Sequence, residues 1–391
     1  MIAPPHHRTT LTWLVVVLYA TAFWIAWPRV ARSHGSITTT VLFDREIVRI
    51  LNDHCVMCHS DQSLAFPLST YEQTWVRGRD MRTQILRRHM PPWAAVAGYG
   101  EFDNDNNLTM RETQFLISWV EGLGPRNAGS VFLNVAKPGA AAREVRAEAH
   151  AGHWQLGDPD LSRQLTATRV ERASRDREAG QADFVQRIVI DPGLTAERQI
   201  RAIEFQPGDR RVVRAATFFV ERTGQWLGSW TPWYGFVKLP DGVAARLPAR
   251  SRIVADVHYR SSDRPVVDQG TVGVFFNRGK ASAVSSDVVL EAKAASSGKS
   301  RASITLTRDA RVWALRPDLV PGISSIELSA RTPDGGTDIL LLAKNPAVEW
   351  PTPYIMKTPR LLRRGTVVSF VVQKHADAEP GGRLRMTMST Y

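Results

Sequence analysis

The sequence predicts a multidomain protein, in which a transmembrane helix precedes a small all-α domain and a long all-β region. Three observations lead to this class: an uncharged apolar stretch near the N-terminus, three helical patterns after it, and short apolar or alternating runs separated by Gly, Pro and Asp. The chain has 391 residues, which suggests two or three domains. Its 43% hydrophobic and 23% charged residues are typical of a globular protein.

The net charge of +12 restricts the partners that the chain can have. The arginines that carry most of it are spread along the sequence, and no Lys/Arg run with interleaved aromatic residues is present. We therefore expect no nucleic-acid binding. We interpret the charge as a basic surface that faces anionic lipid or an acidic partner protein.

The first element is the apolar stretch over residues 9–28, which is bounded by arginines. About 20 residues at helical rise span about 30 Å, the thickness of a hydrocarbon core. Trp13, Trp24 and Trp27 suit the two membrane interfaces. A cleaved signal peptide is the alternative, but the run is long for one and no small-x-small cleavage site follows it. We predict a cytoplasmic tip and transmembrane anchor within residues 1–32.

Three helices are predicted after a short polar spacer. An apolar stripe predicts a helix over residues 43–55, and a second pattern predicts one over residues 71–89 that a pair of prolines stops. A third helix is expected over residues 109–121. Thr109 and Glu112 form a capping box at its start, and glycines follow its end. These helices predict a small domain over residues 41–125.

The cysteines of the chain lie in a single CxxCH motif, formed by Cys55, Cys58 and His59. With two cysteines, a disulfide framework and a four-cysteine zinc site are excluded. Two thiols at this spacing can attach to one porphyrin, and the next residue then supplies an imidazole to the iron. A chance or redox-active CxxC pair is the alternative. We predict one covalently bound haem c, which makes residues 41–125 a cytochrome c domain.

The second axial ligand of the iron is expected downstream, where the predicted second helix ends. Met90 lies there before two prolines that can fix the turn, and a His/Met pair is usual for a cytochrome c. His89, Met81 or an open position are the alternatives. An open position would indicate gas binding or peroxidase chemistry in place of electron transfer.

Three aromatic residues are candidates for packing against the haem, namely Tyr71, Trp75 and Trp93. Each could equally belong to an ordinary hydrophobic core. His54, which precedes the motif, is interpreted as a surface or packing residue. Since covalent haem attachment takes place outside the cytoplasm, residues 30 onward must be translocated. The motif therefore predicts a single-pass protein of the inner membrane with most of the chain in the periplasm.

The remaining sequence divides into a linker and a β region. Residues 126–152 are rich in Ala, Gly and scattered charge, which indicates a linker. Strands are predicted over residues 186–190, 201–205, 211–220, 251–259, 270–276, 301–306, 311–315 and 366–372. This series of short strands predicts one or two antiparallel β-sandwiches. The aromatic segment 224–235, with Trp226, Trp230 and Trp233, could dock a partner, although packing at a sandwich edge is the preferred interpretation.

The motifs together resemble a known arrangement. CVMCH, FPLSTYEQTW, RRHMPPW and the segment 107–125 resemble the small c-type domain of bacterial proteins that also carry a copper type II, ascorbate-dependent monooxygenase-like module. Downstream, GHWQLGDPD, residues 200–213 and GTVGVFF resemble that module. The resemblance implies tandem jelly-roll-like sandwiches, similar to peptidylglycine hydroxylating monooxygenases. We expect the first over residues 153–285 and the second over residues 286–391.

The resemblance also implies two copper sites, and this chain departs from both. Where the family has a His-His pair, the chain has Arg214-Ala215, while His258 matches the histidine of an HY dipeptide. Where the family has His-x-His, Asp318 and Val320 stand. Met386 or Met388 could match the family's methionine. A guanidinium opposes a cation and one imidazole holds copper weakly, so we expect no copper to bind. His258 is interpreted as a β-sheet histidine. His150 and His153 form at most a weak metal site.

These observations predict a membrane-anchored periplasmic monohaem cytochrome for electron transfer. We expect redox protein partners, with the chain as an accessory subunit of a larger membrane complex and the β module as its scaffold or docking domain. One alternative is a copper-dependent monooxygenase with a fused haem donor. The other is a structural or sensory haem subunit. No catalytic residue is assigned.

Overall fold

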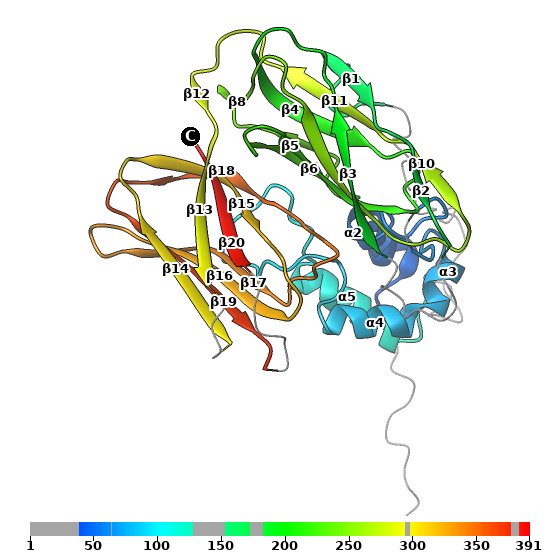
Figure 1. The fold of residues 1–391 in the computed structure, drawn as a ribbon. Coiled ribbons are helices and arrows are strands. Elements are labelled where there is room, and N and C mark those ends of the chain that lie inside the picture. The colour runs from blue at the N-terminus through cyan, green and yellow to red at the C-terminus, as the bar shows by residue number, and fades with distance from the viewer. Residues whose placement is uncertain (1–38, 64, 128–152, 173–182, 294–297, 377–382) are drawn as a thin grey trace, which may run out of the picture.

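Helices precede strands in the computed structural model, and most of the described chain forms β-sandwiches (Figure 1). The structure describes residues 39–63, 65–127, 153–172, 183–293, 298–376 and 383–391. The predicted anchor within residues 1–32 and all but the first two residues of the predicted linker lie outside these ranges. Within them, no helix is long and apolar enough to cross a membrane.

The helices of the first described segment pack around their own hydrophobic core. They are the π-helix η1 (Phe43–Ile47) and the α-helices α2 (Val48–His54), α3 (Tyr71–Val76), α4 (Gly78–Leu86) and α5 (Met110–Glu121). The predicted helix over residues 43–55 is confirmed, with its first turn wound as a π-helix. Ile47 and Leu51 are fully buried on its inner face. The capping box is confirmed as well, because Thr109 Oγ1 accepts from the backbone N–H of Glu112 at 3.2 Å.

The prediction of a single helix over residues 71–89 is wrong, because Arg77 leaves helical geometry and separates α3 from α4. Gly78 then begins α4 where it lies close to α5. A Cβ on this glycine would lie in van der Waals contact with Val120, at 3.4 Å, so α4 and α5 pack closely here. The helix ends at Leu86, two residues before Arg88 takes a left-handed backbone conformation with φ 57°.

The first sandwich is built mainly from two sheets. One has the strand order β1-β11-β4-β8-β12, with β7 also paired to β4, and the other has the order β3-β9-β5-β6. A separate pair consists of β2 and β10. The strands are β1 (Leu161–Gln164), β2 (Thr168–Val170), β3 (Phe184–Ile190), β4 (Arg198–Gln206), β5 (Val213–Val220), β6 (Trp226–Trp230), β7 (Phe236–Lys238), β8 (Val243–Leu247), β9 (Ile253–Tyr259), β10 (Val266–Asp268), β11 (Thr271–Phe276) and β12 (Ala283–Val284).

The second sandwich has two four-stranded antiparallel sheets. Their strand orders are β13-β20-β15-β18 and β14-β19-β16-β17. The strands are β13 (Ser286–Lys293), β14 (Lys299–Thr305), β15 (Ala310–Pro317), β16 (Ile323–Arg331), β17 (Thr337–Lys344), β18 (Tyr354–Leu362), β19 (Val367–Lys374) and β20 (Arg383–Thr390). Since β13 pairs with β20, the start and the end of this region lie side by side.

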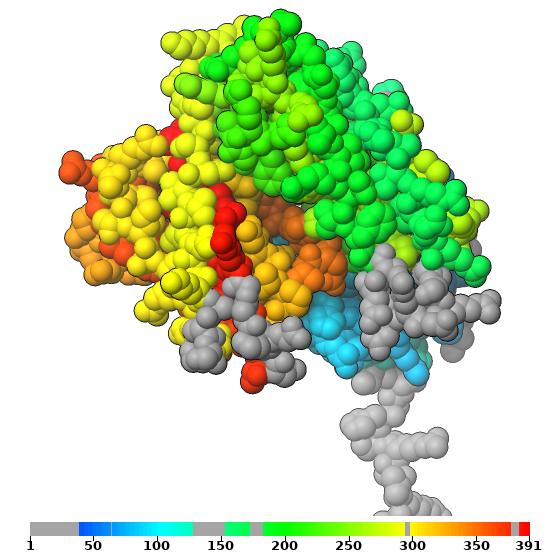
Figure 2. All heavy atoms as spheres, in the orientation of Figure 1, coloured from blue at the N-terminus to red at the C-terminus, as the bar shows by residue number. Residues whose placement is uncertain are grey.

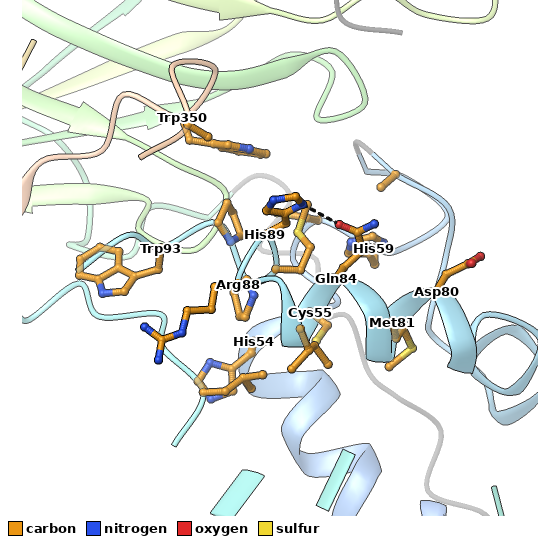
Figure 3. A pocket seen from close by; sticks show the side chains of 18 of the residues that line it. His54, Cys55, His59, Asp80, Met81, Gln84, Arg88, His89, Trp93 and Trp350 are labelled. Atoms are coloured by element: carbon orange, nitrogen blue, oxygen red, sulfur yellow. Dashed lines mark hydrogen bonds between the residues drawn. The ribbon is translucent and has the colours of Figure 1, made fainter. Parts of the chain in front are cut away.

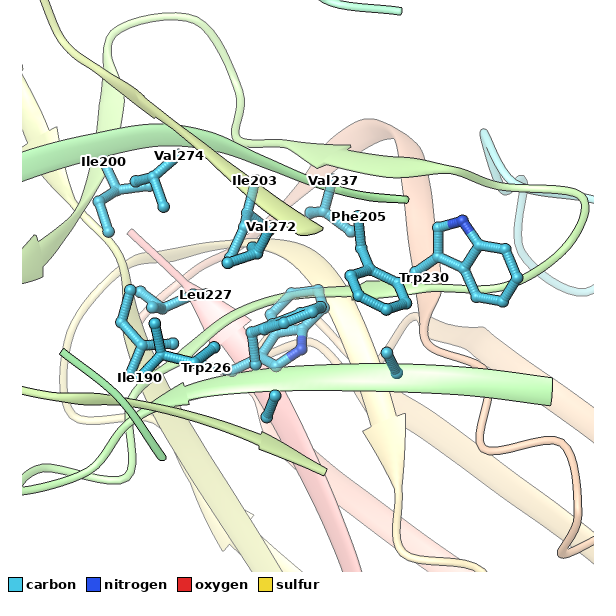
Figure 4. Close-up of a cluster of buried hydrophobic side chains, with 14 of the residues drawn as sticks. Ile190, Ile200, Ile203, Phe205, Trp226, Leu227, Trp230, Val237, Val272 and Val274 are labelled. Carbon is cyan, nitrogen blue, oxygen red and sulfur yellow. The ribbon is translucent and has the colours of Figure 1, made fainter. Parts of the chain in front are cut away.

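All the predicted β runs fall on strands, namely β3, β4, β5, β9, β11, β14, β15 and β19. The aromatic segment 224–235 contains a further strand, β6, in which every residue is buried. Trp226 and Trp230 belong to the hydrophobic core of the first sandwich (Figure 4). The packing interpretation of these two tryptophans is therefore confirmed, since side chains buried in a core are not available to dock a partner.

The two sandwiches pack directly against each other. The core of the first includes Trp313 and Ile355, which come from strands of the second. Trp313 stacks on Trp226 with 5.4 Å between ring centroids, and its Nε1 donates to Ser285 Oγ at 2.9 Å. A buried pair of tryptophans thus joins the two sandwiches.

The segment between α4 and α5 leaves the helical core and joins the second sandwich. Trp93 and Phe102 are buried in the core of that sandwich. Isolated bridges pair Ala95 with β17 and Phe102 with β18. Asn104 strengthens the junction, because its Nδ2 donates to the carbonyl of Pro353 and its Oδ1 accepts from the N–H of Ile355. The helices are therefore tied to the second sandwich by backbone and side-chain contacts.

Candidate functional site

A cavity of about 740 Å³ lies where the helices meet both sandwiches. Its volume falls within the range of about 300–1,000 Å³ that is typical of small-molecule and cofactor sites. Figure 3 shows Trp350 on one side of the cavity and Cys55 on another. In Figure 2, the orange part of the second sandwich lies between the green first sandwich and the cyan helices. The sandwich residues of the lining are Arg214, Arg260, Asn345, Ala347, Glu349 and Trp350.

Cys55, Cys58 and His59 all line this cavity. Cys55 is the C-cap of α2, where the chain leaves helical geometry. The backbone N–H groups of Cys58 and His59 both donate to the carbonyl of Cys55, at 3.0 and 2.9 Å. This tight turn keeps the two thiols and the imidazole at one wall of the cavity.

The imidazole of His59 is oriented by the backbone. Its Nδ1 lies 2.9 Å from the carbonyl oxygen of Phe66, which requires the proton to be on Nδ1. Burial lowers the pKa of His59, so its neutral form is favoured. In that tautomer Nε2 has a free lone pair. A ring held at one nitrogen by a carbonyl, with the other available, is the usual state of a histidine that ligates a metal.

Burial raises the pKa of both cysteine thiols to about 12. For Cys58 the charges of Arg210 and Arg214 act in the opposite direction, without overcoming the effect of burial. Both side chains are therefore neutral thiols near pH 7. The reactive cysteines of disulfide oxidoreductases have lowered pKa values, so this environment differs from that of a redox-active CxxC pair.

The side chains that could supply a second axial ligand, Met90, His89 and Met81, line the same cavity. Met90 is 37% exposed, whereas Met81 is buried in the helical core. The Nδ1 atom of His89 lies 3.1 Å from Oε1 of Gln84. Any test of the axial ligand must therefore compare all three side chains.

The three aromatic residues that were predicted to pack against the haem lie in different environments. Trp93 lines the cavity, and its ring also contacts Tyr354 and Phe102 in the second sandwich. Tyr71 and Trp75 are not among the cavity-lining residues. Tyr71 packs against Phe43 in the helical core and donates its hydroxyl to Gly124, while Trp75 is 55% exposed. Aromatic character alone could not separate these environments.

None of the six sandwich residues of the cavity lining was predicted as a site residue, including Arg214, Arg260 and Trp350. Arg214 is the extra residue of a β-bulge, since Val213 pairs with Tyr259 while Ala215 pairs with His258. Bulges commonly redirect a side chain away from the regular alternation of a strand. Arg260 directly follows β9. The available signal was the position of Arg214 at an expected copper ligand.

The other residues that were aligned with copper ligands lie away from the cavity lining or lack donor groups. His258 lies on β9, and burial lowers the pKa of its imidazole. Asp318 and Val320 follow β15, and Met386 and Met388 are fully buried on β20. Among the residues that the structure describes, no group of three or more His, Cys, Asp or Glu side chains is placed to hold a metal ion. His153 is exposed, and His150 lies outside the described residues.

Comparison with known proteins gives little guidance. No family model and no curated protein matches the chain. Among solved structures, the major capsid protein P2 of bacteriophage PM2 matches at 8% identity, covering 57% of this chain and 96% of that one, with a TM-score of 0.26. An allantoicase matches at 10% identity, covering 54% of this chain and 78% of that one, with a TM-score of 0.19. Similarity at this level supports no conclusion about fold or function.

Proposed function

We propose that this chain is a c-type cytochrome, anchored in the inner membrane by residues 1–32, that carries electrons on the periplasmic side. One observation carries the proposal: Cys55, Cys58, His59 and Met90 line a single cavity of suitable size. The CxxCH pattern is that of covalent haem attachment, and a His/Met ligand pair is used by electron-carrying cytochromes. The bond between His59 and Phe66 supports the same assignment.

A haem c at this site supplies a one-electron redox centre. Cys55 and Cys58 hold it through two thioether bonds. His59 offers Nε2 to the iron, while the carbonyl of Phe66 keeps the ring in the required tautomer. Met90 would supply its thioether as a further ligand of the iron.

For the β module we propose a role as scaffold or docking domain, within a chain that serves as an accessory subunit of a larger redox complex. The positions that resemble copper ligands support this role, because Arg214, Asp318 and Val320 occupy them. A guanidinium opposes a bound cation, and His258 alone is a weak copper site. The partner is expected to be a redox protein.

Covalent haem attachment is the first test. The full chain would be produced in a bacterial host with a c-type haem ligation system. We expect haem to remain with the denatured polypeptide on a gel and to be lost from the Cys55→Ser/Cys58→Ser double variant. Folded wild-type chain recovered from this host without covalent haem would contradict the proposed function.

The second test identifies the axial ligand. We expect Met90→Ala to abolish the methionine–iron charge-transfer band of the oxidised protein and to let carbon monoxide bind the reduced haem, because an axial position is opened. Met81→Ala and His89→Ala are matched controls from the same cavity and should keep the band. Loss of the band in Met81→Ala, with its retention in Met90→Ala, would reassign the ligand to Met81. Absence of the band from the wild type, with carbon monoxide binding opened by His89→Ala, would reassign it to His89.

A further inference from the structure

Two arginines of the first sandwich give part of the cavity wall a positive charge. Arg214 comes from the bulge in β5, and Arg260 from the end of β9. Both side chains line the same cavity as Cys58 and His59. The guanidinium groups therefore lie within electrostatic reach of the residues that hold the haem.

Arg214 is largely buried and only partly satisfied. Its Nη2 pairs with Asp183 Oδ2 at 2.8 Å, and its guanidinium carbon lies 5.5 Å from the ring centroid of Trp350. Its Nε is buried and has no hydrogen-bond partner among the described residues. Buried polar groups normally have a partner, because an unpaired donor is costly. The hydrogen bonds of this guanidinium are therefore not all formed within the protein.

The other charges at this wall define what a further acceptor can be. Arg88 also lines the cavity, together with the carboxylates of Asp80 and Glu349. Asp183, the residue before β3, pairs with Arg214, and burial raises the pKa of Asp183 against the opposing charges of Arg214 and Arg260. An entering anion would share or take over the guanidinium that Asp183 now holds.

We propose that Arg214 and Arg260 bind the carboxylate side chains of the haem, so that the first sandwich closes the haem pocket and raises the reduction potential. This inference rests on the proposed function. The propionates are the anionic groups of a haem, and the planar fork of a guanidinium matches a carboxylate. Reduction adds an electron to the haem, so a nearby positive charge favours the reduced form.

The test is a redox titration of the holoprotein and its variants. We expect Arg214→Gln and Arg260→Gln each to lower the midpoint potential, by a shift on the order of tenfold in the ratio of oxidised to reduced haem, which is about 59 mV for one electron. Arg214→Lys keeps the positive charge but not the planar fork of the guanidinium. Its midpoint potential should lie between those of Arg214→Gln and the wild type. Asp183→Asn should shift the potential in the opposite direction, because it leaves more of Arg214 to the haem.

Arg210→Gln is the matched control. The charge of Arg210 also acts on Cys58, but this side chain does not line the cavity and lies over the ring of Trp230. Its removal should change the potential less than either cavity arginine. Equal shifts at the three positions, or wild-type potentials in haem-loaded Arg214→Gln and Arg260→Gln, would overturn the inference. Absence of haem from the wild type would instead overturn the proposed function.

Discussion

The carboxylate of Asp268 is 1% exposed in the first sandwich. Tyr259 donates its hydroxyl to Oδ2 at 2.7 Å, and the backbone N–H of Asp209 donates to Oδ1 at 2.7 Å. Burial raises the pKa of Asp268, and these hydrogen bonds only partly offset that effect. The ionised form is therefore less favourable here than in the unfolded chain.

A pH dependence of stability follows from this carboxylate. Since its folded pKa lies above the unfolded value of 3.8, the folded state retains the proton longer, and stability falls as the pH rises through this interval. Asp268→Asn removes the effect. We expect the free energy of unfolding of this variant to rise relative to the wild type from about pH 4 toward neutrality. Urea unfolding at a series of pH values measures it.

Tyr259→Phe is the companion variant, because it removes a hydrogen bond that favours the carboxylate and keeps the carboxylate itself. The loss of stability with rising pH should then become steeper. If the difference between Asp268→Asn and the wild type stays constant with pH, Asp268 does not titrate as the structure predicts.

At the scale of elements, β6 and β15 meet through one aromatic pair, Trp226 and Trp313. Both rings are nearly fully buried, so replacing either one by alanine should cost about 3–5 kcal/mol through lost contacts and a cavity. The two losses should not add. A stacked pair is worth about 0.5–1.5 kcal/mol beyond its burial, which is the coupling that we expect in a double-mutant cycle. Additive losses in chemical denaturation would show that the strands do not depend on this pair.

The elements that the sequence predicts are those whose pattern is local. The β-branched run 366–372 identifies β19, and the capping box at Thr109 locates the start of α5. Other elements depend on distant partners. The strand β20 is rich in polar residues, and it is defined by its pairing with β13 and β15. The break at Arg77, between α3 and α4, is likewise not indicated by any local pattern.

The same division applies to the site. Cys55, Cys58 and His59 are adjacent in the sequence, so the motif alone identifies them. Met90 was inferred from its position after a helix. Arg260 and Trp350 reach the cavity only through the packing of both sandwiches, and that information is not contained in any short segment. For this reason the sequence located the CxxCH wall of the cavity but not the walls that the sandwiches form.

At the scale of the whole molecule, the cavity has walls from the helices and both sandwiches. A haem attached there would stabilise the arrangement of all three, because its apolar contacts with their side chains form only in the folded chain. We expect the haem-free Cys55→Ser/Cys58→Ser variant to lose its β signal in circular dichroism at a lower temperature than the holoprotein. Equal midpoints for the β signal would mean that the sandwiches are stable independently of the cavity.

The short segment after α4 connects Met90 to the second sandwich. Met90 faces the cavity, while Trp93, three residues later, is fixed in the core of the second sandwich. Three residues span at most about 10 Å, so the segment from Met90 to Trp93 allows the methionine little movement relative to the second sandwich. The position of Met90 is therefore coupled to the position of the second sandwich. A partner that shifts this sandwich against the helices would pull on that side chain without touching the cavity.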